Sequence, residues 1–157
     1  MTKYERILVA TDFSPDCEAA FDEATRMARE WGARLYVLHV YETPAGASAP
    51  YTPVTGYFET LAAVRAVAEK RLQDLTSRES MKGVDVRALA ERGLAAETIV
   101  ETASREGADL IVMGTRGRRG AARLLLGSVA ARVIATAPCP VLTLRRPTPV
   151  AAASGAA

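Results

Sequence analysis

Residues 114–129 combine glycine, arginine and serine in a spacing that suits phosphate binding. Two residues separate Gly114 from Gly117, nine separate Gly117 from Gly127, and Ser128 follows directly. Glycine permits positive φ angles and a close approach of a ligand to the backbone. A helix N-terminus favours an anion through its unpaired N–H groups and its dipole. Because the stretch follows an apolar run at 110–113 and ends where a helical pattern begins, we interpret it as a phosphate-binding turn and predict a nucleotide site.

The turn is not one of the two common phosphate-binding motifs. It has no Gly-Lys-Ser/Thr, and the chain has no lysine after Lys82, which excludes a kinase-type phosphate loop. Its glycines run G-x-x-G-x-x-G and follow a late strand, whereas a dinucleotide fingerprint opens the first helix. It also carries arginines at positions 116, 118, 119 and 123. These arginines either strengthen the contact with phosphate or belong to a solvated loop. The sequence supports the two interpretations equally.

A second polar turn, Ala10-Thr11-Asp12, follows the apolar run that begins at Ile7. In open parallel sheets, ligands lie beyond the carboxyl ends of the strands. If the strand before Asp12 neighbours the strand before Gly114, both turns face one crevice. Asp12 could then accept hydrogen bonds from ribose hydroxyls and, with phosphate oxygens, hold Mg²⁺. The alternative is a polar turn residue beside a helix cap at Ser14.

Apolar patterns along the 157 residues alternate between strand and helix. Strands are expected at 7–11, 34–40, 84–90, 110–113 and 141–144. Helices are expected from the Ser14 cap to Gly32, over 57–81, from about Ala96 to Gly107, and over 128–137. Such alternation predicts a single α/β domain with a mainly parallel sheet covered on both faces. Residues 41–56 form a long connection of unassigned role, and residues 147–157 are expected to be a flexible tail.

Few other side chains suggest catalysis. His39, the single histidine, is expected to pack with one satisfied nitrogen, in preference to acting as a general base. Cys17 and Cys139 form no CxxC pair and are expected to be small buried thiols, although a thiol in the first turn of a helix can be acidified. No metal-ligand spacing of His or Cys with carboxylates is present. The chain is thus not expected to be an enzyme, or at most one with weak nucleotide hydrolysis or self-phosphorylation.

The distribution of charge indicates the kind of ligand, and the hydropathy of the chain indicates where the protein is found. The net charge is +2, but no acid follows Asp109 while seven arginines do, so the C-terminal third suits an anionic ligand. No apolar run reaches membrane-spanning length, and the first residues do not form a signal peptide. With unpaired cysteines, these features predict a cytoplasmic protein.

The ordered set of motifs resembles the universal stress protein family. The family pattern is Gly, two residues, Gly, nine residues, then Gly-Ser or Gly-Thr, and the glycine turn matches it without a departure in spacing. The opening run Ile7 to Ser14 resembles the family's first strand and acidic turn. The segments 107–115, 125–129 and 137–142 resemble its fourth strand, closing helix and last strand, so the resemblance covers nearly the whole chain.

This resemblance implies a fold and a site. The fold is an open five-stranded parallel sheet of order 3-2-1-4-5 with four helices, occupying residues 1–146. Members with the glycine motif bind ATP, with adenine near the ends of strands one and two, ribose at the aspartate and phosphates at the glycines. The positions implicated here are Ala10, Thr11, Asp12, Val40, Met113, Gly114, Arg116, Gly117, Gly127, Ser128 and Val129.

The resemblance also implies a homodimer, or a pair of such dimers. In the order 3-2-1-4-5 the last strand lies at an edge of the sheet, where unpaired N–H and C=O groups can pair with a second chain. The interface positions are Val141, Leu142, Thr143 and Leu144. The protein is therefore expected to be a nucleotide-dependent stress-response dimer that binds ATP, with Mg²⁺. The alternatives are a slow ATPase or self-phosphorylating switch, and a module whose arginine-rich loop binds nucleic acid or a partner; the lack of interleaved aromatics disfavours nucleic acid.

Overall fold

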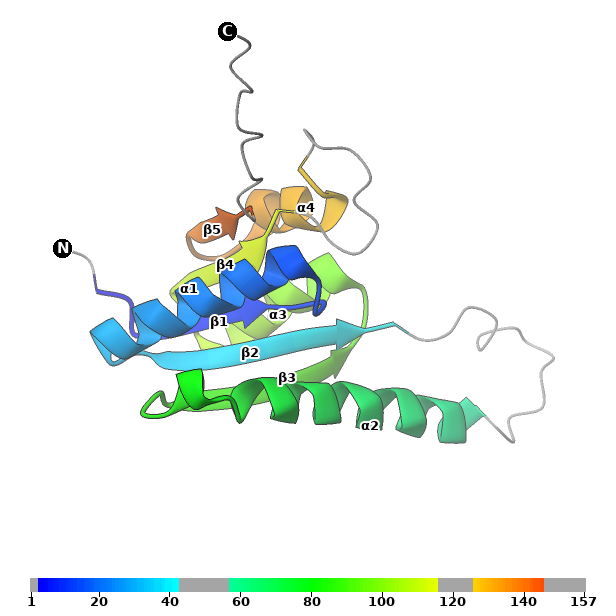
Figure 1. The fold of residues 1–157 in the computed structure, drawn as a ribbon. Helices are drawn as coiled ribbons and strands as arrows, with labels where there is room; N and C mark the ends of the chain where they lie inside the picture. The colour runs from blue at the N-terminus through cyan, green and yellow to red at the C-terminus, as the bar shows by residue number, and fades with distance from the viewer. Residues whose placement is uncertain (1–2, 43–56, 116–125, 146–157) are drawn as a thin grey trace, which may run out of the picture.

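Five parallel strands form one sheet in the order β3-β2-β1-β4-β5, as expected (Figure 1). The computed structural model describes residues 3–42, 57–115 and 126–145. The strands are β1 (Arg6–Ala10), β2 (Arg34–Tyr41), β3 (Val86–Arg92), β4 (Leu110–Gly114) and β5 (Val141–Leu144). The helices of the described residues are α1 (Pro15–Trp31), α2 (Tyr57–Thr76), α3 (Ala95–Glu106) and α4 (Ser128–Thr136), with a 3₁₀ turn η1 (Glu79–Met81).

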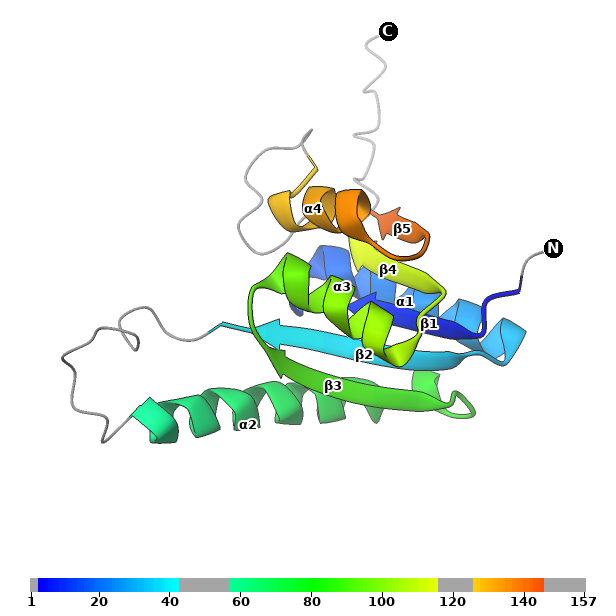
Figure 2. The ribbon, with the colours of Figure 1, turned by 180° about the vertical axis from the view of Figure 1, so that it is seen from behind.

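The helices cover the sheet in two layers (Figures 1 and 2). Ile7 and Val9 of β1 belong to a core beneath α1 and α2. Leu8 and Ala10, which alternate with them, belong to a second core with α3 and α4. Every residue of β1 after Arg6 and every residue of β4 is buried, because both central strands are covered on both faces. Side-chain alternation along the strands therefore decides which layer each residue meets.

Local signals place the ends of α1 and α3. The Ser14 hydroxyl accepts the N–H of Cys17 at 3.5 Å, and Pro15 begins α1. Gly32 and Gly107 end α1 and α3 with φ of 66° and 64°, a left-handed conformation in which glycine carries no steric cost. These predicted boundaries are confirmed.

Two predicted boundaries were wrong. The helix predicted to continue to Met81 ends at Thr76, and Met81 reaches the core through the separate 3₁₀ turn. The third strand is shifted from 84–90 to Val86–Arg92 because its ends are set by pairing, from Leu35 with Val86 to Tyr41 with Arg92. The apolar pattern thus identified β3 as a strand, while pairing with β2 determined where it begins and ends.

Several sequence predictions lie outside the described residues. These are most of the 41–56 connection, the 147–157 tail, and two site positions, Arg116 and Gly117. Within the described ranges, the structure contains no helix that is both long and apolar enough to cross a membrane.

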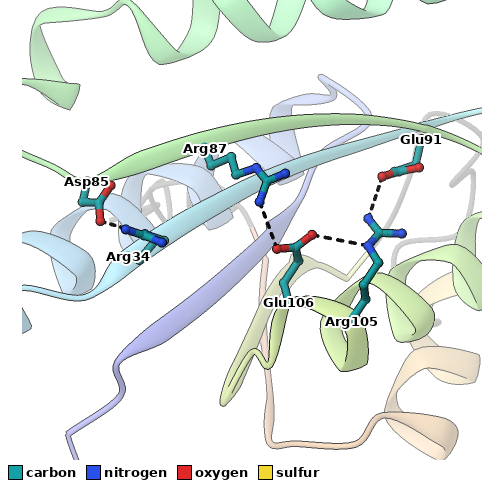
Figure 3. A network of polar contacts seen from close by, with 6 residues as sticks. All are labelled: Arg34, Asp85, Arg87, Glu91, Arg105 and Glu106. Atoms are coloured by element: carbon teal, nitrogen blue, oxygen red, sulfur yellow. Dashed lines mark hydrogen bonds and ion pairs between the residues drawn. The ribbon is translucent and has the colours of Figure 1, made fainter.

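The two edge strands differ in their charge. On β3, Arg87 pairs with Glu106 of α3 at 3.2 Å and Glu91 pairs with Arg105 at 2.6 Å, and Arg105 also contacts Glu106 at 3.3 Å (Figure 3). At the start of this strand, Asp85 pairs with Arg34 at 2.7 Å. Charged side chains of this kind discourage pairing with another sheet edge. The other edge, β5, reads Val-Leu-Thr-Leu and carries no charge.

Gly114 allows α1 to approach the end of β4. A β-carbon at Gly114 would lie 3.1 Å from the carbonyl carbon of Asp16 and 3.2 Å from the amide nitrogen of Cys17, which are backbone atoms. Contacts this short would force the first turn of α1 away from the sheet. This glycine is therefore required for packing, whatever it does for a ligand.

We expect Gly114→Ala to lower the free energy of unfolding by about 1–3 kcal/mol, the usual cost of forcing an extra methyl group into a packed site. Gly127→Ser is the matched control, since Gly127 has φ −62° and ψ 150°, which any residue adopts, and serine is a good N-cap for α4. Urea denaturation of both variants provides the comparison. Equal stability of Gly114→Ala and the wild type would contradict the packing role.

Candidate nucleotide site

A cleft of about 920 Å³ lies at the carboxyl ends of β1, β2 and β4. The structure brings together in its wall nine of the eleven positions implicated by the sequence. They are Ala10, Thr11, Asp12, Val40, Met113, Gly114, Gly127, Ser128 and Val129. The volume is in the range of small-molecule sites.

The Asp12 turn is held by two side-chain-to-backbone hydrogen bonds. Thr11 Oγ1 accepts the N–H of Phe13 at 3.0 Å, and Asp12 Oδ1 accepts the N–H of Ser14 at 2.8 Å. Between them, Phe13 has φ 61°, a left-handed conformation that non-glycine residues rarely adopt and that clusters at functional sites. Asp12 thus serves the turn and also lines the cleft, so the two roles considered for it are compatible.

Gly114, Gly127 and Ser128, the described residues of the glycine motif, form another part of the cleft wall. The Gly127 N–H donates to the carbonyl of Thr115 at 2.8 Å, which ties the start of α4 to the end of β4. Among the described residues no side chain caps α4 at Gly127, and Gly127, Ser128 and Val129 line the cleft, so the N–H groups at the start of α4 are available to a ligand there. Thr115 Oγ1 is buried and has no hydrogen-bond partner among the described residues. A buried donor without a partner costs free energy that a ligand oxygen can recover.

One face of the cleft is apolar. Ala10, Val40 and Met113 all belong to, or pack against, the core shared with α3 and α4. Leu38, Ile99 and Ala130 line the cleft on this same face. This wall suits the faces of a purine ring, which bury well against aliphatic side chains.

Two further residues that line the cleft, His39 and Arg71, were not assigned to the site by sequence reasoning, and both contact Phe13. The rings of Phe13 and His39 lie 4.6 Å apart, and the Arg71 guanidinium of α2 lies 4.1 Å from the Phe13 centroid. His39 Nδ1 lies 2.8 Å from the carbonyl of Thr11, so Nδ1 carries a proton and donates it. The expectation that His39 packs with one satisfied nitrogen is confirmed. Nothing in the local sequence connects Arg71 to this turn, because fifty-six residues separate it from Ser14.

Neither cysteine is acidified. Burial raises the pKa of the Cys17 thiol, and this effect exceeds the hydrogen bonds that lower it. Burial is also the main cause that raises the pKa of Cys139. The possibility of a reactive thiol in the first turn of α1 was wrong, because desolvation outweighs the helix position.

A preformed metal cluster is absent from residues 3–42, 57–115 and 126–145, where no three His, Cys, Asp or Glu side chains converge. Two carboxylates, Asp12 and Glu42, line the cleft. Asp12 is compatible with Mg²⁺, which often uses one carboxylate together with substrate phosphates. The residues present therefore fit a metal that arrives with a nucleotide.

Solved structures share this architecture. Hypothetical protein MJ0577 is 26% identical, with a TM-score of 0.81 over 94% of this chain and 99% of that chain. A universal stress protein in complex with cAMP is 25% identical, with a TM-score of 0.60 over 92% of this chain and 99% of that chain. The universal stress protein from Archaeoglobus fulgidus in complex with dAMP is 25% identical, with a TM-score of 0.55 over 92% of this chain and 100% of that chain.

The sequence comparisons agree. Universal stress protein MJ0531 of Methanocaldococcus jannaschii is 35% identical over 147 residues, which are 92% of this chain and 84% of that protein. The model of the universal stress protein family matches residues 3–145. With the sheet order, the cleft and this match over nearly its whole length, the chain belongs to the universal stress protein family.

Proposed function

We propose that this protein is a cytoplasmic regulatory protein that binds ATP in the cleft between the ends of β1 and β4. The observation that carries the proposal is the convergence of the Asp12 turn and the start of α4 on one apolar cleft. Relatives of similar fold that hold cAMP and dAMP support an adenine nucleotide as the ligand. ATP in particular is what the resemblance to members with the glycine motif implies, and backbone N–H groups at such a motif suit a phosphate chain.

Each part of the nucleotide has a matching wall. The adenine would lie on the aliphatic face formed by Ala10, Val40 and Met113. The ribose hydroxyls would donate to the Asp12 carboxylate, and the phosphates would accept from the first turn of α4 at Gly127 and Ser128. Asp12 would hold Mg²⁺ together with the nucleotide, and the metal would neutralise phosphate charge.

The proposal is for binding and not for rapid catalysis. The Asp12 carboxylate accepts a hydrogen bond from a backbone N–H, and His39 donates one to the Thr11 carbonyl. Both side chains therefore stabilise the turn. A slow ATPase or self-phosphorylating switch remains the alternative, and turnover measured under excess MgATP decides between them. Binding to oligonucleotides that weakens steeply with salt would instead favour the arginine-rich loop as a nucleic-acid site.

We expect saturating MgATP to stabilise the protein. At 100 times its dissociation constant a ligand adds about 2.7 kcal/mol, which for a chain of this size raises the melting temperature by about 5–10 °C. Differential scanning fluorimetry and titration calorimetry measure the two quantities. An unchanged melting temperature together with no heat of binding would refute the proposal.

We expect Gly127→Val to lose at least tenfold in ATP affinity while the protein stays folded. The branched side chain would occupy the space at the start of α4 where the phosphates are proposed to bind, and valine is a poor N-cap, which costs about 1 kcal/mol of stability. Gly117→Val, the second motif glycine, is expected to behave alike. Circular dichroism and calorimetry on both variants are the measurements; unaltered binding by both would make these glycines irrelevant to the ligand.

We propose that the regulatory unit is a homodimer paired through β5. In the described sheet, Ile111 N–H donates to Pro140 O at 3.0 Å and Thr115 N–H donates to Leu144 O at 2.9 Å. Because hydrogen bonding along a strand alternates, Leu142 and Leu144 face β4, while the backbone of Val141 and Thr143 faces the open edge. An antiparallel pair of such edges closes on itself about a two-fold axis, which limits assembly to dimers or pairs of dimers.

We expect Thr143→Pro to produce monomers with the sheet intact, since proline removes an outward N–H and is tolerated on an edge strand. Leu142→Pro is the contrasting variant, because it removes an N–H that faces β4 and should lower the stability of the monomer. Light scattering and thermal denaturation separate the two effects. A wild-type protein that stays monomeric at high concentration, with and without ATP, would exclude the dimer.

A further inference from the structure

Arg71 is the one permanently cationic side chain among the described residues that line the cleft. It comes from α2, where its neighbours are paired: Arg65 contacts Glu69 at 2.7 Å, and Lys70 contacts Asp74 at 3.5 Å. Arg71 itself forms no ion pair with any described carboxylate, and its described contact is the ring of Phe13. A guanidinium that contacts an aromatic ring keeps N–H donors for an anion.

Arg71 approaches the cleft from the side opposite to the proposed base and phosphates. Phe13 packs against the core beneath α1 and α2, and its ring contacts His39. Along β2, Leu38 and Val40 face the α3–α4 core, so His39 between them faces the α1–α2 side. Helix α2 contacts β2 and β3, whereas α4 contacts α3 and β5. Figures 1 and 2 show α2 near the β3 edge of the sheet and α4 near the β5 edge. The Asp12 turn lies between these two sides of the cleft.

A bound nucleotide would therefore meet Arg71 at its ribose. With the base on the aliphatic face and the 5′ phosphates at α4, the sugar lies at Asp12, and its 2′ and 3′ positions are the part left to face the α2 side. Phe13, which Arg71 contacts, is the residue next to Asp12 in the chain. An arginine near ribose hydroxyls is a known way of recognising a phosphate on the sugar.

We propose that Arg71 is a specificity residue that recognises a phosphate ester on the ribose 2′ or 3′ oxygen, so that the cleft prefers ribose-phosphorylated adenine nucleotides over the unsubstituted ones. This inference rests on the proposed function of the cleft as an adenine nucleotide site. It adds a second anion position, supplied by α2 and separate from the glycine motif. The large cleft volume, about 920 Å³, leaves room for the additional group.

The test compares AMP with adenosine 2′,5′-bisphosphate and adenosine 3′,5′-bisphosphate by titration calorimetry on the full chain. The wild type is expected to bind one of the bisphosphates about tenfold more tightly than AMP, the effect of one charge-assisted contact. In Arg71→Gln this ratio should fall to about one while AMP affinity changes less than about twofold. Arg71→Lys should recover part of the ratio. Arg65→Gln, on the same helix, is the matched control and should keep it.

Three results would overturn the inference. One is a wild type that binds AMP and both bisphosphates equally, and another is a preference that survives in Arg71→Gln. The third is an equal loss of AMP and bisphosphate affinity in Arg71→Gln, which would make Arg71 a general contact. Failure of AMP, MgATP and both bisphosphates to bind the wild type would refute the proposed function as well, so the two failures are distinguishable.

Discussion

The parallel pairing of β1 with β4 is the constraint on which the rest of the molecule depends. The two strands pair from Ile7 with Leu110 to Ala10 with Met113, so both end at the same level of the sheet. Asp12 and Gly114 then lie in the wall of one cleft, although about a hundred residues separate them in the chain. Because both strands are buried on both faces, a slip of one residue would exchange the side chains of the two cores, and burial therefore holds the register.

The same end of β4 also determines how closely the first turn of α1 packs against the sheet. Gly114 lets the backbone of Asp16 and Cys17 approach β4 closely, and the Ser14 cap and the Asp12 hydrogen bond direct the chain into that helix. The left-handed conformation of Phe13 is part of this connection. Packing and ligand binding thus depend on the same few residues, so a glycine in the motif can serve either purpose or both.

The side of the sheet that each residue faces determines which side chains line the cleft, and the charge of each edge strand affects its tendency to pair. Alternation along β1, β2 and β4 sends Ala10, Val40 and Met113 to the α3–α4 side of the cleft and His39 to the α1–α2 side, where α2 supplies Arg71. At the edges, β3 is tied to α3 by ion pairs, which reduces its tendency to pair with another chain (Figure 3). The uncharged β5 has no such protection within the described residues, and this contrast supports β5 as the interface.

The sequence by itself determined the element types and the layered α/β class, and it led to nine positions that line one cleft. Short apolar runs, the Ser14-Pro15 cap and the closing glycines are local signals, and the ordered set of motifs identified the family and, through it, these positions. Only the tertiary structure decided the ends of β3, the packing role of Gly114 and the basicity of the Cys17 thiol. It also brought Arg71 to the Asp12 turn. The reason is physical: caps and periodicity act over a few residues, whereas strand length, desolvation and cation–π contacts depend on partners that are distant in the chain.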